Sequence, residues 1–205
     1  MTVRSIYIVD DDDVVRASLH SLLSILPDIM IQSFRTGDAF LASQDDLSPG
    51  VLLLDIHMPG ISGMDVLKAI EGAGKFATIM LTGRGDVQLA ISAMKSGVVD
   101  FIEKPYEFDV LYAAIELAFA RLEKDSRLQA RVEQAKAMID LLSPREKDVL
   151  AGLIDGRSNK MIAIDLEISP RTVEIYRANL MDKLKVGSLS EALRLAFTAG
   201  LIGNE

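Results

Sequence analysis

The chain has 205 residues, a length that favours two small domains over one large one. Hydrophobic residues make up 49% of it and charged residues 25%, and no apolar stretch is long enough to cross a bilayer. With no cysteine and only two histidines, disulfides, thiol catalysis and cysteine-ligated or histidine-rich metal sites are excluded, so any metal must bind through oxygen.

The formal net charge of −8 is unevenly distributed along the chain. Residues 1–142 hold 13 Lys and Arg against 21 Asp and Glu, whereas residues 143–205 hold nine of each. An acidic chain binds polyanions poorly in general, but its neutral part can still present a basic face to nucleic acid. The N-terminal segment runs into four consecutive aspartates where a secretory signal needs an apolar core, so we expect a cytoplasmic protein with no membrane partner.

Five apolar, β-branched runs alternate with helical periodicity through the first 120 or so residues. Their ends lie 20 to 27 residues apart, which fits one strand, one helix and short turns. We therefore predict an α/β domain with a doubly wound, five-stranded parallel sheet of order 2-1-3-4-5. The predicted strands are Ile6–Val9, Met30–Phe34, Val51–Leu54, Thr78–Leu81 and Val99–Ile102.

The stretch from Glu107 to Leu142 contains no glycine or proline and predicts one long helix. Apolar residues follow a 3-4 spacing along it, interrupted at Arg121 and Asp125. Two interpretations stay open: the last helix of the first domain continuing as a solvated linker, or a dimeric coiled coil.

A second, all-α domain begins at Ser143-Pro144-Arg145-Glu146, where a serine N-cap, a first-turn proline and a glutamate three residues on predict a capping box. Turn residues separate helices expected over 144–154, 158–166, 170–184 and 189–199. The predicted organisation is an α/β domain over 1–122, a helical linker over 123–142 and a helix-turn-helix domain over 143–205.

Polar residues that can take part in catalysis or metal binding follow the predicted strands of the first domain. Asp10 and Asp11 follow the first strand, Asp55 the third, Thr82 the fourth and Lys104 the fifth. The carboxyl ends of parallel strands meet at one edge of a sheet, and carboxylates gathered there repel one another unless a hard cation such as Mg²⁺ compensates. We predict that Asp55 attacks phosphorus, while Mg²⁺ and Lys104 neutralise the phosphoryl oxygens and the Thr82 hydroxyl donates a hydrogen bond to them.

Two neighbouring positions have separate expected roles. Asp12 and Asp13 are expected to cap and charge-complement the first helix rather than to bind metal. His57 lies two residues beyond Asp55, and we expect its backbone carbonyl, not its ring, to be a metal ligand.

The segments IVDDD, LLLDIHMPGISG, MLTGRGD and AMKSGVVDFIEKP, within residues 3–122, resemble the receiver domain of bacterial two-component response regulators. The resemblance implies that Asp55 accepts a phosphoryl group from a sensor histidine kinase and that Lys104 contacts the phosphate. It implies an Mg²⁺ site made by Asp10, Asp11, Asp55 and the His57 carbonyl.

The same resemblance makes Thr82 and Phe101 a switch pair, in which the hydroxyl moves toward the phosphoryl group and the ring follows. It also implies a cis peptide bond between Lys104 and Pro105.

In the second domain, the helix from Asn159, a short turn and the helix after Ser169 have helix-turn-helix spacing. Val173, Tyr176, Leu180 and Leu184 form the core stripe of the second helix, so its other face is predicted to read DNA. The predicted DNA-binding residues are Lys160, Arg171, Thr172, Glu174, Ile175, Arg177, Ala178, Lys183 and Lys185, with Arg177, Lys183 and Lys185 suited to phosphates.

The segments LSPREKDVL and NKMIAIDLEISPRTVEIYRANLMDKL resemble the LuxR-type helix-turn-helix across about 142–203. Together with the receiver, nearly the whole chain is similar to response regulators that control nitrogen-fixation or micro-oxic genes. Glu174 departs from the lysine of many relatives, which puts the base contacts carried over to it in doubt. A glutamate there could accept a hydrogen bond from cytosine N4.

The sequence thus predicts a transcription regulator in which phosphorylation of Asp55 controls homodimerisation and binding to promoter DNA, with RNA polymerase as a further partner. It is expected to catalyse only its own phosphoryl transfer and dephosphorylation, and so not to be an enzyme. Two alternatives stay open. One is a phosphohydrolase with an aspartyl-phosphate intermediate, which would usually have a second carboxylate where His57 stands. The other is a phosphorylated interaction module without a DNA role.

Overall fold

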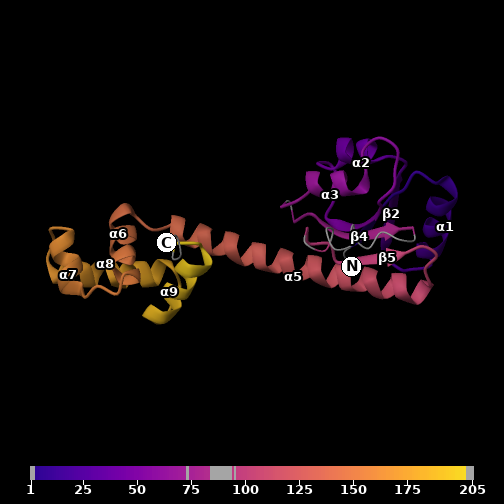
Figure 1. Cartoon of the computed structure of the whole chain (residues 1–205). Helices are drawn as coiled ribbons and strands as arrows, with labels where there is room; N and C mark the ends of the chain where they lie inside the picture. The colour runs from indigo at the N-terminus through magenta and orange to yellow at the C-terminus, as the bar shows by residue number, and fades with distance from the viewer. Residues whose placement is uncertain (1–2, 73, 84–93, 95, 202–205) are drawn as a thin grey trace. The chain divides into compact units, whose positions relative to one another are not determined.

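The computed structural model describes residues 3–72, 74–83, 94 and 96–201 (Figure 1). The chain divides into two compact units, Met1–Asp125 and Ser126–Glu205. Most of the segment between the fourth and fifth strands lies outside the described residues, and with it parts of the MLTGRGD and AMKSGVVDFIEKP motifs.

The first unit is built on a parallel five-stranded sheet with the strand order β2-β1-β3-β4-β5. This confirms the predicted fold and strand order, and each strand covers most or all of the run predicted for it. The strands are β1 (Arg4–Val9), β2 (Ile29–Phe34), β3 (Gly50–Asp55), β4 (Phe76–Thr82) and β5 (Asp100–Glu103).

Both faces of the sheet are covered, which is why its central strands are apolar at nearly every position rather than at alternate ones. Ile6 and Ile8 of β1 point into a core that includes residues of α1 (Asp13–Leu23) and α5 (Phe108–Asp140). Tyr7 and Val9 point into a second core with α2 (Gly37–Ser43) and α3 (Gly63–Ala69). Because these strands are parallel, the carboxyl ends of β1, β3, β4 and β5 emerge at one edge of the sheet.

Helix α5 contributes to the cores of both units. Leu111 and Ala118 are buried in the first core, and Ile139 is buried in the core of the second unit. Between these ends, Leu128 is 59% exposed. The predicted long helix is confirmed, and in the single chain its middle is solvated; the coiled coil remains a prediction.

The described residues of the second unit form helices joined by short turns, with no strand among them. Each of its four helices begins after a serine whose side chain accepts a backbone N–H of the first turn, an interaction that stabilises a helix by about 1 kcal/mol. The predicted capping box at Ser143 and Glu146 is present. The helices are α6 (Pro144–Ile154), α7 (Asn159–Asp165), α8 (Pro170–Lys183) and α9 (Leu189–Thr198), within one residue of the predicted bounds.

Candidate functional site

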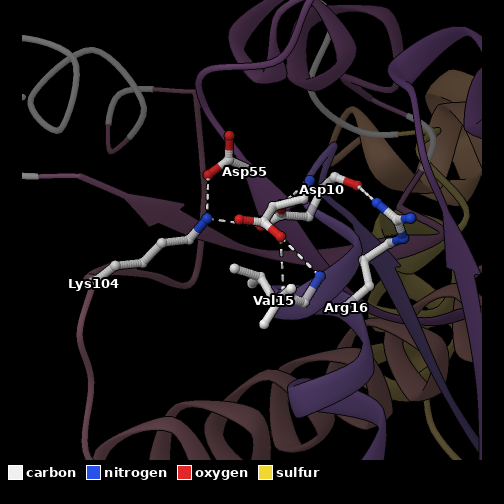
Figure 2. A network of polar contacts seen from close by, with 7 residues as sticks. Asp10, Val15, Arg16, Asp55 and Lys104 are labelled. Carbon is white, nitrogen blue, oxygen red and sulfur yellow. Dashed lines mark hydrogen bonds and ion pairs between the residues drawn. The ribbon is translucent and has the colours of Figure 1, made fainter.

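A lysine joins two buried carboxylates at the carboxyl edge of the sheet. The Nζ atom of Lys104 lies 2.7 Å from Oδ2 of Asp10 and 2.5 Å from Oδ1 of Asp55. Both aspartates are buried, at 1% and 6% exposure. Figure 2 shows the lysine side chain reaching between the two carboxylates. Three of the predicted site residues, far apart in the sequence, thus form one hydrogen-bonded cluster.

The strand register brings these residues together. Asp10 follows the last residue of β1, Asp55 ends β3, and Lys104 follows β5. The backbone N–H of Lys104 donates to the carbonyl of Thr82 at 2.7 Å, which extends the β4–β5 pairing by one residue and directs the lysine toward the neighbouring strand ends. The Lys104-Pro105 peptide bond is cis, as the resemblance implied.

Burial governs the electrostatics of this cluster. It raises the pKa of Asp55, and the Asp10 charge adds to the rise, although hydrogen bonding to Lys104 and to the His57 backbone opposes it. For Lys104, burial alone would lower the pKa, but hydrogen bonds to Asp10 and Asp55 outweigh it and the pKa is raised. The lysine therefore stays protonated and holds a positive charge beside the Asp55 carboxylate.

A glycine lets α3 approach the end of β3 closely. The N–H of Gly63 donates to the carbonyl of Ile56 at 3.0 Å, and a Cβ at residue 63 would lie 2.1 Å from the backbone oxygen of Asp55. No side chain fits in this space. The GISG segment therefore ends in a glycine because the backbone around the candidate nucleophile is packed against the helix start.

The proposed switch residues lie on adjacent strands. Thr82 is buried at the end of β4, and its hydroxyl donates to the carbonyl of Gly83 at 2.9 Å. Phe101 of β5 is partly buried and packs against the core shared with α2 and α3. Met80, two residues before Thr82, is the residue paired with Phe101 in the sheet.

The turn between β1 and α1 is held by its own side chains. Asp12 is the N-cap of α1 and accepts from Val14 at 2.8 Å, and Asp13 lies in the first turn, as predicted. Arg16 was not among the predicted site residues. Its Nη1 donates to the carbonyl of Asp10 at 2.5 Å (Figure 2). Its Nη2 contacts the Asp13 carboxylate. The three-residue spacing between Asp13 and Arg16 was the available signal.

The donor atoms at this edge suit a hard cation, because they are buried carboxylate oxygens. Within the described residues, however, no three or more His, Cys, Asp and Glu side chains are grouped so as to hold a metal ion. Of the predicted ligands, the structure brings Asp10 and Asp55 together, and Asp11 is partly exposed beside them. His57 is exposed, and its backbone N–H bonds to the Asp55 carboxylate.

Helix α8 has a buried apolar face and an exposed, mostly polar face. Val173, Leu180 and Leu184 are buried and Tyr176 is partly buried against the same core, which confirms the predicted stripe. Most of the predicted DNA-reading residues are exposed on the rest of the helix, and Thr172 is partly buried with its hydroxyl bonded to that of Ser169 at 2.8 Å. The exposed ones are Arg171, Glu174, Ile175 and Ala178, with Lys160 of α7 and Lys185 after α8 also exposed.

Two of the predicted phosphate-binding residues have partners inside the unit. Nη1 of Arg177 donates to Oδ1 of Asn159 at 2.6 Å, which connects α8 to the start of α7. Nζ of Lys183 lies 2.6 Å from Oε2 of Glu146, a buried carboxylate that also accepts from the Ser143 backbone. The Lys183 ammonium therefore compensates the buried charge of the Glu146 carboxylate.

Comparison with known families agrees with this geometry. Residues 6–116 match the response regulator receiver domain, and residues 140–196 match the bacterial regulatory proteins of the luxR family. The chain therefore belongs to the two-component response regulators that carry a receiver domain and a LuxR-type DNA-binding domain. Family membership makes it a transcription regulator with a histidine kinase partner and promoter DNA as its target, and the alternative phosphohydrolase and DNA-free interaction module gain no support.

Among individual proteins, the chain is similar to the transcriptional regulatory protein FixJ of Bradyrhizobium diazoefficiens, with 44% identity over 97% of each chain. The crystal structure of full-length FixJ from B. japonicum matches with a TM-score of 0.60 and 44% identity over 99% of this chain and 100% of that one. The response regulator StyR matches with a TM-score of 0.80 and 31% identity over 96% and 99%. Receiver domains generally use Mg²⁺ for phosphorylation. No helix in the described part of the chain is long and apolar enough to span a membrane.

Proposed function

We propose that Asp55 is the phosphoacceptor and that its phosphorylation by a sensor histidine kinase switches the protein's binding to promoter DNA. The observation that carries this proposal is the Lys104 ammonium, held at 2.5 Å from the Asp55 carboxylate and at 2.7 Å from Asp10. In the proposed step an Asp55 oxygen attacks phosphorus, the bond to the donor's leaving group breaks, and Lys104 compensates charge on the transferred phosphoryl oxygens. Thr82 donates a hydrogen bond to the phosphoryl group and, with Phe101, transmits the change.

Asp10, Asp11, Asp55 and the His57 carbonyl would hold Mg²⁺ in this proposal. The ion would neutralise phosphoryl oxygens and relieve repulsion among the carboxylates. The chain's own contribution is the buried, oxygen-rich edge in which Lys104 is already placed.

Labelling by acetyl phosphate tests the site. We expect stoichiometric, Mg²⁺-dependent labelling of the wild type and none of Asp55→Asn, because an amide cannot form an acyl phosphate. Asp46→Asn, at an exposed position outside the cluster, is the matched control and should be labelled like the wild type. Full labelling of Asp55→Asn would move the phosphoacceptor elsewhere.

We further propose that the exposed face of α8 enters the major groove. Arg171, Glu174 and Ile175 are exposed and extend away from the core, so they can reach base edges, with Thr172 and Ala178 beside them. The residues that would contact phosphates are Arg177, Lys160, Lys183 and Lys185. In this proposal Asn159 orients the Arg177 side chain and Glu146 orients the Lys183 side chain.

Binding to randomised DNA separates the two classes of contact. Arg171→Ala and Ile175→Ala should relax base preference at a defined position by about 1–3 kcal/mol. Lys185→Ala should weaken binding to all sequences and reduce the slope of log K against log salt by about 0.9 per lost phosphate contact. A changed base preference in Lys185→Ala, with an unchanged salt slope, would reverse the assignment.

The similarity to FixJ, whose name marks it as a transcriptional regulatory protein, supports a last part of the proposal. Phosphorylated chains pair as homodimers in the cytoplasm, bind two half-sites and engage RNA polymerase to regulate nitrogen-fixation or micro-oxic genes. Transcript profiles of a wild-type strain and an Asp55→Asn strain under low oxygen test the target class, since only the wild type should change transcription of those genes.

A further inference from the structure

We propose that Arg16 is a positioning residue that fixes the turn between β1 and α1 in the shape required to bind the divalent cation. The inference rests on the proposed function, because it concerns the same edge of the sheet. Arg16 touches neither Asp55 nor Lys104 in any contact of the structure; it acts on the backbone and side chains of the turn that carries Asp10 and Asp11 (Figure 2).

The guanidinium spans the turn. The side chain of Arg16 is only 13% exposed, so its position is fixed by packing. One of its nitrogens, Nη1, donates to the Asp10 carbonyl at 2.5 Å, and the other, Nη2, contacts the Asp13 carboxylate. The planar guanidinium presents these two nitrogens in a fixed fork, whereas lysine offers a single nitrogen on a flexible stem and does not reproduce that geometry.

Residue 10 is anchored on both sides. Its carbonyl is held by Arg16, and Oδ1 of its side chain accepts from the Asp12 backbone at 2.9 Å, which leaves Oδ2 for Lys104. Asp11 lies between Asp10 and Asp12, which the hydrogen bond to Oδ1 joins, so the backbone orientation of Asp11 follows from theirs. Loss of the Arg16 contact would release the Asp10 carbonyl and with it the direction in which Asp10 and Asp11 present their oxygens. Groups that orient metal ligands in this way typically affect metal affinity by about 10- to 100-fold.

Charge and position predict opposite results for Arg16. A positive charge near a cation site weakens binding of the cation, so if charge alone mattered, Arg16→Gln would bind the cation more tightly. If position matters, Arg16→Gln binds it more weakly, and Arg16→Lys does so too although its charge is kept. Arg35 supplies the matched control, because it also approaches Asp13, at 3.9 Å, but is 71% exposed on its side chain and has no contact with the Asp10 carbonyl.

The test measures binding of Mn²⁺ alone to the full-length protein, by electron paramagnetic resonance of the free ion, with circular dichroism and thermal unfolding as checks of the fold. We expect Arg16→Lys and Arg16→Gln to bind Mn²⁺ about 10-fold or more weakly than the wild type, with Arg35→Gln unchanged. Acetyl phosphate labelling of Arg16→Lys should recover at saturating metal, which a general loss of folding would not allow.

Equal binding by the wild type and Arg16→Lys, with tighter binding by Arg16→Gln, would show that Arg16 acts by charge alone and would overturn the inference. If Arg16→Gln fails to fold, Arg16→Lys decides the matter by itself. Failure of the proposed metal site gives a different result: the wild type and Asp55→Asn would then bind Mn²⁺ equally or not at all, and the inference would fall with it.

Discussion

Glu146 is a buried carboxylate with one partner at the start of α6 and another at the end of α8. It accepts from the Ser143 backbone at 2.7 Å and from Lys183 at 2.6 Å. Burial would raise its pKa, but these hydrogen bonds and the lysine charge outweigh burial, so the pKa lies below its ordinary value of 4.5. A single residue thus caps α6 and connects it to the end of α8.

Removing Lys183 alone should destabilise the second unit more than neutralising Lys183 and Glu146 together. Lys183→Met leaves a buried carboxylate unpaired, which typically costs about 3–5 kcal/mol, reduced here because Lys183 is partly exposed. Adding Glu146→Gln to Lys183→Met should recover part of the lost stability, because the buried group is then neutral. Amide hydrogen exchange of α6 and α8 in the full chain measures both variants. A double variant less stable than Lys183→Met would contradict the pairing.

The lowered pKa of Glu146 also gives a pH dependence with a definite sign. The folded state binds this proton less tightly than the unfolded state, so the stabilisation is complete above about pH 4.5 and is lost as the pH falls through the lower folded value. Glu146→Gln has no such proton to bind. The stability difference between wild type and Glu146→Gln, measured by urea unfolding, should therefore narrow below pH 4.5 and stay constant from pH 6 to 8.

Gly63→Ala tests the close approach of α3 to β3, the strand that carries Asp55. The added methyl group would meet backbone atoms, which cannot rotate away, so we expect a loss of about 1–3 kcal/mol in unfolding free energy together with slower phosphorylation. Gly83→Ala is the matched control for stability, because a Cβ there meets none of the described residues within 4 Å. Equal stability of the two variants in urea would mean that α3 can shift at no cost.

At the scale of elements, local signals predicted the second unit well and the site only in part. Serine caps and the Ser143 capping box mark helix starts within a few residues of themselves, so the bounds of α6 to α9 followed from the sequence. Strand order placed Asp55 and Lys104 at one edge. The Arg16 contact to a backbone carbonyl and the Glu146–Lys183 pair depend on side-chain directions and on packing between helices, which spacing along the chain does not encode.

The C-terminal end of α5 packs into the core of the second unit, so a stable fragment of this unit must include it. Ile139 and Leu142 are buried in its core, although the sequence analysis placed them in the linker. A fragment of residues 143–205 lacks these side chains, and burial of an Ile or Leu contributes about 1.5–3 kcal/mol. A fragment of residues 126–205 should therefore unfold at a clearly higher urea concentration by circular dichroism. Coincident unfolding curves would show that α5 adds nothing to this core.

For the whole molecule, the question is which surface would join two phosphorylated chains. Phosphorylation with acetyl phosphate should shift the wild type to a dimer in sedimentation velocity at micromolar concentration, and Asp55→Asn should stay a monomer. The middle of α5 is a poor interface. Arg121 and Asp125, at two seam positions, pair with each other along the helix, and of the seam positions there only Leu128 and the half-buried Val132 offer apolar surface. Stable interfaces bury about 800 Å² on each partner, far more than two side chains supply.

We therefore propose that the receiver surface near Phe101 carries the contact, and we expect the phosphorylated Leu128→Lys variant to dimerise like the wild type. Phe101 is partly buried on β5, the edge strand, and the Thr82 end of β4 lies beside it, so a movement at the phosphorylated edge reaches this surface over a short distance. Lys124→Leu is the reverse control on the same helix and should leave the monomer–dimer equilibrium unchanged if the seam is not used. A phosphorylated Leu128→Lys protein that sediments as a monomer would instead assign dimerisation to α5 and revive its interpretation as a coiled coil.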